Sequence, residues 1–233
     1  NVNDSSGNNN HLTNNSNINI SFVLFESGKD NYAVVFDDRP LQISSSKIDL
    51  SKYAWTIAVW VKTTATGTDQ YILSQGQTGT GQLLHLNWLD DNIMRFGLYS
   101  DDIEHTISKT TYLNTWIHLA FTYNLSGHRE IFLNGSRVKH DTNDSTFTNT
   151  GNNDLYIGRY SSGQNTSDLQ MDDLRIYKGV VSASEILQIY NDTLGTQPEA
   201  DSKFTYFTKK DDITGLSGQI ENTLILSNLT NID

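Results

Sequence analysis

The chain has 233 residues, no cysteine and a net charge of −11. The missing cysteines exclude a disulfide framework, zinc–thiolate sites and thiol catalysis. The acidic balance argues against sequence-independent nucleic-acid binding, which depends on Lys and Arg, and no apolar run is long enough for a membrane span. Residues 1–19 are rich in Asn and Ser, so we expect a polar linker there, and the remaining length suits one large β domain with an appendage.

Short runs of β-branched and aromatic residues, separated by turn residues, predict many strands in the first half of the chain. These runs cover residues 20–25, 32–36, 41–44, 55–62, 71–74, 83–88 and 93–99. Residues 55–62 carry apolar side chains at both odd and even positions, which predicts a central strand covered on both faces, with Trp60 in the core.

The second half continues the pattern, with strands predicted at residues 114–123, 154–159 and 171–177. Residues 129–138 form a predicted hairpin, because Asn134-Gly135 tolerates the positive φ angles of a type I′ turn. His118, alone among apolar neighbours, is expected to be a core residue. A helix is predicted from Ser182, since Glu185 three positions later completes a capping box.

Several of these segments together resemble LamG-like (laminin G/pentraxin-like) domains of the concanavalin A-like lectin/glucanase superfamily. The matching segments, in order, are WTIAVWVK, NTWIHLAFTY, the hairpin REIFLNGSRV, DLYIGR, and MDDLRIY followed by VSASEI. The resemblance implies an all-β, two-sheet antiparallel jelly-roll β-sandwich over residues 20–194, with one short helix near its end. Residues 195–233 lie outside it, and two further predicted strands, at 203–208 and 223–229, suggest an appended β element or a connection to a neighbouring domain.

The superfamily includes lectins, adhesion modules and glycoside hydrolases. A laminarinase-type enzyme is expected to carry a Glu-x-Asp-x-x-Glu strand, and this chain has none, so we expect no catalytic activity. A carbohydrate-binding or cell-adhesion module of a longer extracellular, cell-surface or virion-surface protein fits better. Sugar recognition needs aromatic faces and planar polar groups, and the candidate ligand-binding residues are Trp88, Arg95, Tyr99, Asp101, Tyr160 and Asn165. The alternative is a structural protein–protein interaction domain in a surface or virion fibre.

The acidic pair in the strand 171–177 calls for a partner, because carboxylates are costly inside a sheet. One hypothesis is a Ca²⁺ site in which Asp37 or Asp38 on an early turn meets Asp172 or Asp173. The other is that one of these carboxylates pairs with Arg39 or Arg175, or caps a turn. The expected partners of the domain are therefore a glycan or a surface protein, with Ca²⁺ as the candidate cofactor, and neither nucleic acid nor membrane insertion is expected.

Overall fold

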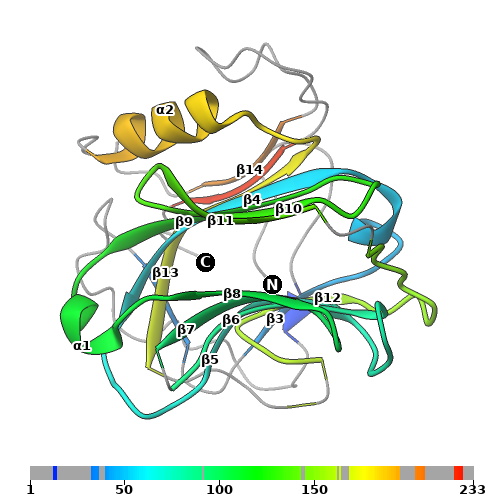
Figure 1. Ribbon diagram of the computed structural model, residues 1–233, viewed down its shortest axis with the longest axis horizontal. Helices are drawn as coiled ribbons and strands as arrows, with labels where there is room; N and C mark the ends of the chain where they lie inside the picture. The colour runs from blue at the N-terminus through cyan, green and yellow to red at the C-terminus, as the bar shows by residue number, and fades with distance from the viewer. Residues whose placement is uncertain are drawn as a thin grey trace.

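The computed structural model shows two antiparallel sheets stacked face to face, with one helix across the outside of the upper sheet (Figure 1). The structure describes residues 33–36, 40–90, 92–142, 145–161, 163 and 168–194 in full, and the backbone alone of 13–14, 203–207 and 223–227. No helix within these residues is long and apolar enough to cross a membrane. The predicted all-β, two-sheet sandwich is confirmed.

One sheet has seven strands among the described residues. In spatial order they are β1 (Thr13–Asn14), β3 (Leu41–Ile43), β12 (Leu155–Ile157), β5 (Gln70–Gly76), β6 (Leu83–Trp88), β7 (Ile93–Leu98) and β8 (Asp102–Thr106). The strand β8 was not predicted, and it forms one edge of this sheet.

The second sheet has eight strands in the described part of the chain. They are β11 (Ser136–Asp141), β10 (Arg129–Leu133), β9 (Ile117–Tyr123), β4 (Trp55–Thr63), β13 (Leu169–Lys178), β15 (Thr223–Ser227) and β14 (Lys203–Phe207), with β2 (Val34–Phe36) on one end of β13. The strands predicted near residues 203 and 223 are therefore present, and β15 extends the sheet by pairing with β13. The predicted strand at 20–25 lies outside the described residues.

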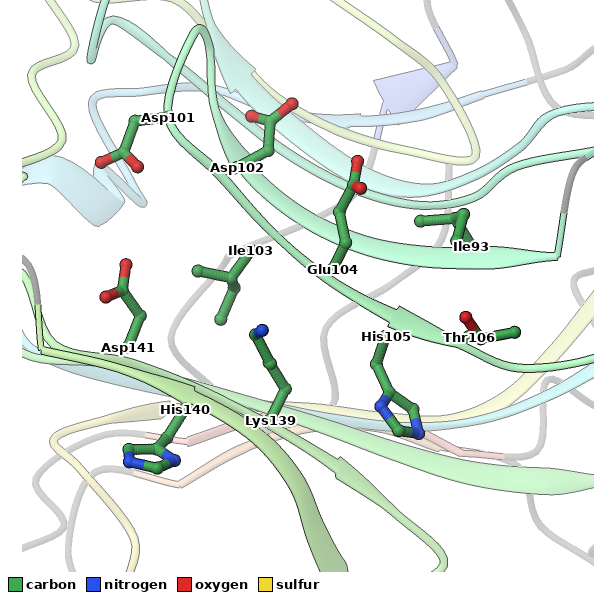
Figure 2. Close-up of a pocket in the computed structure, with 10 residues that line it drawn as sticks. All are labelled: Ile93, Asp101, Asp102, Ile103, Glu104, His105, Thr106, Lys139, His140 and Asp141. Carbon is green, nitrogen blue, oxygen red and sulfur yellow. The ribbon is translucent and has the colours of Figure 1, made fainter.

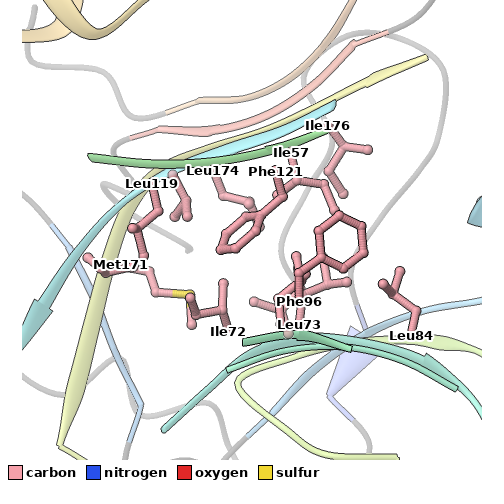
Figure 3. Close-up of a cluster of buried hydrophobic side chains, with 14 of the residues drawn as sticks. Ile57, Ile72, Leu73, Leu84, Phe96, Leu119, Phe121, Met171, Leu174 and Ile176 are labelled. Atoms are coloured by element: carbon pink, nitrogen blue, oxygen red, sulfur yellow. The ribbon is translucent and has the colours of Figure 1, made fainter. Parts of the chain in front are cut away.

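The main core fills the space between the two sheets, where alternate side chains of each strand meet (Figure 3). Residues Ile57, Leu119, Phe121, Leu174 and Ile176 come from the eight-stranded sheet, and Leu73, Leu84 and Phe96 come from the seven-stranded one. This arrangement explains the alternation that predicted the strands, because successive residues of a strand face opposite sides of the sheet.

A second, smaller cluster lies between the outer face of the eight-stranded sheet and α2 (Ala183–Leu194). It contains Ala58 of β4 together with Ile186 and Ile189 of the helix, so β4 is covered on both faces, as predicted. Ser182 and Glu185 form the predicted capping box, since the Ser182 backbone N–H donates to Glu185 Oε2 at 3.0 Å and the Ser182 hydroxyl accepts from the Glu185 backbone N–H at 3.3 Å. Two short helices, η1 (Leu50–Lys52) and α1 (Lys109–Tyr112), complete the described elements.

Trp60 and His118 also lie under α2 and are buried, as the sequence predicts. Their rings meet edge to face, with centroids 5.3 Å apart, and the Trp60 indole N–H donates to Thr193 at 2.9 Å. Burial, together with the charge of Arg175, lowers the pKa of His118 from 6.5 to about 3. His118 is therefore a neutral packing residue over the ordinary pH range.

Candidate functional site

The outer face of the seven-stranded sheet carries a row of polar and aromatic side chains. Register places Tyr71 of β5 opposite Asn87 of β6, Asn87 opposite Arg95 of β7, and Arg95 opposite Glu104 of β8. Residues directly opposite each other in antiparallel strands share a face. This row therefore crosses four strands on the side that faces away from the core.

Arg95 is the charged centre of this row. Its Nε and Nη2 lie 2.8 and 2.7 Å from Glu104 Oε1, and its Nε lies 3.3 Å from Asp102 Oδ2. The Arg95 side chain is 28% exposed, so the guanidinium is fixed by two carboxylates yet still accessible. Planar donors and acceptors held in this way suit hydrogen bonding to sugar hydroxyls.

His85 occupies the next row of the same face, where its ring lies over Gly97. A Cβ on Gly97 would come within 2.0 Å of His85 Nε2, so only glycine leaves room for the ring. His85 Nε2 lies 3.6 Å from Asp102 Oδ1, and its Nδ1 lies 3.3 Å from the Leu83 carbonyl. Burial raises the pKa of Asp102, but the hydrogen bond from His85 and the charges of His85 and Arg95 outweigh that effect and leave the pKa lowered.

Tyr160 covers one side of this arrangement. Its ring centroid lies 5.3 Å from that of Tyr71 and 5.6 Å from that of His85. Burial raises the pKa of Tyr160, with further contributions from Tyr99 and Asp102. Tyr160 is only half-buried, so part of it can contact a ligand.

The turn between β7 and β8 is strained. Tyr99 and Ser100 both have positive φ, 36° and 68°, in a two-residue hairpin turn where glycine and asparagine are preferred. Such a conformation is unusual for a residue as bulky as tyrosine, and backbone strain of this kind tends to occur at functional sites. The turn places Tyr99 close enough to Tyr160 to influence its pKa.

A cavity of about 570 Å³ adjoins this face, between the edge strands β8 and β11 of the two sheets (Figure 2). Side chains of the two strands face each other across it. Its lining residues are Ile93, Asp101, Asp102, Ile103, Glu104, His105, Thr106, Lys139, His140 and Asp141. Asp102 and Glu104 belong both to this cavity and to the row around Arg95, so the outer face and the cavity form one continuous polar surface around β8.

Arg129 joins the two sheets by binding two residues that line this cavity, Asp101 and Asp141. It is fully buried, donating from Nη1 to the Asp101 carbonyl at 2.6 Å and from Nη2 to the carboxylates of Asp101 and Asp141 at 3.0 and 2.7 Å. Asp101 belongs to the β7–β8 turn, whereas Arg129 and Asp141 are cross-strand partners on β10 and β11. The hydrogen bonds of Arg129 therefore fix the turn that carries Tyr99.

The structure gathers three of the six predicted ligand-binding residues, Arg95, Tyr99 and Tyr160, on one face. The prediction that Trp88 binds a ligand is corrected by the structure. Trp88 is 1% exposed, packs in the main core and donates its indole N–H to the Ile107 carbonyl at 2.8 Å. Its ring therefore offers no open face to a sugar. Asp101 is also a correction, since its carboxylate is engaged by Arg129 instead of pointing to this face. Asn165 lies outside the described residues.

The acidic pair on β13 has a structural explanation. Asp172 and Asp173 lie at a β-bulge opposite β4, and Asp173 adopts the positive φ, 48°, that aspartate tolerates at such positions. The Asp173 carboxylate pairs with Arg175, with Nε–Oδ1 and Nη2–Oδ2 distances of 2.8 Å. Asp37 and Asp38, the other proposed Ca²⁺ ligands, lie outside the described residues. Among the residues that the structure describes, no three acidic or histidine side chains form a group that could hold a metal ion. The Ca²⁺ site therefore stays a prediction.

Five residues of this face were not among the candidates: Tyr71, His85, Asn87, Asp102 and Glu104. The signal for the two acids was available, because a two-residue turn at Tyr99-Ser100 pairs residue 97 with 102 and Arg95 with 104. Strand parity then places both carboxylates on the same side as Arg95.

Comparison with known proteins supports the same fold. A laminin G family profile, described as the Concanavalin A-like lectin/glucanases superfamily, matches residues 28–187, more than half of the chain. No curated protein matches the chain significantly.

Among solved structures, the fold is similar to the binding domain of Paraclostridial Mosquitocidal Protein 1, with a TM-score of 0.60 and 15% identity over 88% of this chain and 52% of that one. It is similar to the binding domain of Botulinum Neurotoxin DC in complex with SialylT, with a TM-score of 0.60, 16% identity and the same coverage of both chains. The chain spans about half the length of these solved chains. Because the family profile covers most of the sandwich, this protein belongs to the concanavalin A-like lectin/glucanases superfamily.

Proposed function

We propose that this domain is a non-catalytic glycan-binding module of a longer surface protein, and that it binds its ligand on the outer face of the seven-stranded sheet. The observation that carries the proposal is the arrangement of Tyr160 beside Arg95, with Asp102 and Glu104 fixing the guanidinium. An aromatic ring can cover the apolar side of a sugar, while the fixed polar groups exchange hydrogen bonds with its hydroxyls.

The carboxylates of this face support binding over hydrolysis. A glycosidase needs one carboxylic acid with a raised pKa to protonate the leaving group. Here the pKa of Asp102 is lowered, and Glu104 accepts two short contacts from Arg95. Asp102 therefore favours its charged form and the Glu104 carboxylate is already bound to Arg95, an arrangement that suits hydrogen-bond acceptors better than a general acid.

The similar folds are compatible with this proposal, since one of the matched structures was solved in complex with SialylT. At 16% identity that likeness concerns the fold alone, so the ligand and its position must be tested on this chain.

The test is a glycan array on the purified domain, followed by calorimetric titration of each hit with the wild type and with Tyr160→Ala. If a sugar ring and Tyr160 cover roughly 50 Å² of apolar surface, at about 25 cal/mol per Å², the loss is roughly 1.2 kcal/mol, or about an eightfold weaker Kd. Tyr53→Ala is the matched control, because Tyr53 is an exposed tyrosine that stacks with Lys178 of the other sheet.

A folded wild-type domain that binds no glycan would overturn the proposal. So would hits whose affinities change equally in Tyr160→Ala and Tyr53→Ala, because the site would then lie elsewhere. Thermal melting of both variants separates lost binding from lost folding, since Tyr160 also packs on Tyr71 and His85.

A further inference from the structure

Arg159 differs from every other arginine in the described part of the chain. The other four, Arg95, Arg129, Arg137 and Arg175, each have a carboxylate within 4 Å. Arg159 has no such partner there, although the whole chain carries a net charge of −11. An arginine left without a carboxylate in so acidic a protein needs an explanation.

The Arg159 side chain is held in place by an aromatic ring. Its guanidinium carbon lies 4.8 Å from the centroid of the Tyr156 ring, a cation–π contact. The Arg159 carbonyl accepts a hydrogen bond from Ser74 at 2.7 Å, which fixes the backbone, and Nε is buried without a hydrogen-bond partner. The guanidinium is therefore oriented before any ligand arrives.

Arg159 lies on the same face as the Tyr160 site. Register places Tyr156 of β12 opposite Ser74 of β5, and Ser74 opposite His85 of β6. Since neighbouring strands are about 4.8 Å apart, two strands separate Tyr156 from His85 by roughly 10 Å. One ligand of two sugar rings can span both positions.

Asp154, the acidic residue that immediately precedes β12, already has hydrogen-bond partners. Asp154 accepts hydrogen bonds from the Gln42 side-chain amide and, at 2.9 Å, from the Ser45 backbone N–H. At the other end of the face, Asp102 and Glu104 are bound to Arg95. The face is thus polarised, with an available cation at the β12 end and carboxylates at the β8 end.

We propose that Arg159 binds the carboxylate of an acidic sugar, so that the ligand class is a glycan bearing a sialic or uronic acid. This inference rests on the proposed glycan-binding function and specifies its ligand. The planar guanidinium can bind a carboxylate through two parallel hydrogen bonds, and the Arg159 side chain is only partly buried. A neighbouring neutral sugar then reaches the ring of Tyr160.

The experiment compares matched acidic and neutral probes: sialyllactose against lactose, and a disaccharide ending in glucuronic acid against its glucose counterpart. Binding is measured by calorimetry for the wild type, Arg159→Gln, Arg159→Lys and the control Arg137→Gln, which removes a surface arginine of the other sheet. We expect the wild type to bind one acidic probe at least tenfold more tightly than its neutral partner. Arg159→Gln should lose that preference, Arg159→Lys should keep part of it, and Arg137→Gln should keep all of it.

Raised salt should weaken the acidic probe selectively, because an exposed charge pair is screened. The inference is wrong, and the proposed function stands, if the wild type binds acidic and neutral probes equally or if Arg159→Gln retains the acidic preference. If neither kind of probe binds to a folded wild type, both proposals fall. Thermal melting of Arg159→Gln, together with its retained binding of neutral probes, shows that a lost preference is not a loss of folding.

Discussion

Replacing Arg129 by methionine tests whether the two sheets depend on a buried charge. Arg129 has no exposed surface, and its guanidinium binds Asp101 of one sheet and Asp141 of the other. Methionine is unbranched and apolar like the arginine stem, but it provides no donor. The substitution leaves two carboxylates facing each other without the cation that holds them.

The expected cost follows from the burial of the partners. Removing one member of a buried ion pair typically costs about 3–5 kcal/mol, because the remaining charge stays desolvated. The Asp101 and Asp141 side chains are 25% and 14% exposed, so water can partly solvate them once Arg129 is gone. We therefore expect the lower end of the range, about 3 kcal/mol.

Urea unfolding followed by tryptophan fluorescence measures this loss. With an m value of about 2–3 kcal/mol per M, a loss of about 3 kcal/mol lowers the midpoint by roughly 1–1.5 M. The control is Arg137→Met, because Arg137 is half exposed and pairs with Glu130 at the surface, where an ion pair contributes at most about 1 kcal/mol. Arg129→Lys, which keeps the charge but not the fork of donors, should fall between the two.

Equal midpoints for Arg129→Met and Arg137→Met would refute the reasoning. A further variant tests the mechanism itself: adding Asp141→Asn to Arg129→Met removes one of the stranded charges. The double variant should be more stable than Arg129→Met alone, and if it is less stable, the unpaired carboxylates are not the cause of the loss.

Two further perturbations address the helix-covered face and the glycan site. His118 stays neutral in the folded state, whereas in the unfolded state it takes up a proton below about pH 6.5, so the free energy of unfolding falls as the pH drops from 6.5 toward 3. His118→Leu should reduce this fall by up to about 1.4 kcal/mol per pH unit, measured by urea unfolding at pH 4, 5 and 6. Gly97→Ala forces the His85 ring off its position, because the new Cβ would collide with it. We expect a loss of about 1–3 kcal/mol in the free energy of unfolding, measured by thermal melting, and the loss of glycan binding, measured by calorimetry.

Each of these has an outcome that contradicts it. For the histidine, the matched control is His128→Leu, an exposed position in a turn, and identical pH slopes for the two variants would show that His118 is not the group responsible. For the glycine, wild-type melting together with wild-type affinity in Gly97→Ala would mean that His85 can move without consequence.

Most strands were predictable because each buried run is bounded by turn residues and shows either alternation or continuous apolar character. The strand β8 escaped because Asp102–Thr106 has one apolar residue among five, and its edge position leaves several of these side chains at least partly exposed. Edge strands carry a weaker hydrophobic signal, since no neighbour covers their outer side. The capping box at Ser182 was predictable because it depends on local spacing alone.

The candidate site was harder to predict, because it depends on which side of a sheet each residue faces. The alternation within β6 carried the answer for Trp88, because polar His85 and Asn87 take the odd positions while Leu84, Leu86 and Trp88 take the even ones and lie in the core. Choosing Asp101 over Asp102 was an error of one position, and in a strand one position reverses the face. The outward direction of Arg95 was predictable because apolar Met94 and Phe96 flank it.

The order of strands in the eight-stranded sheet has a consequence for how the chain folds. Its neighbours β4 and β13 come from distant parts of the sequence, so that Thr56 and the Gly179 carbonyl, 123 positions apart, are joined by a hydrogen bond. Closing so long a loop must precede the contacts that stabilise it, which makes folding slow relative to proteins dominated by local contacts. During synthesis, one edge of the apolar strand β4 stays unpaired until β13 has been made. In that interval its exposed apolar surface can associate with other unfolded chains.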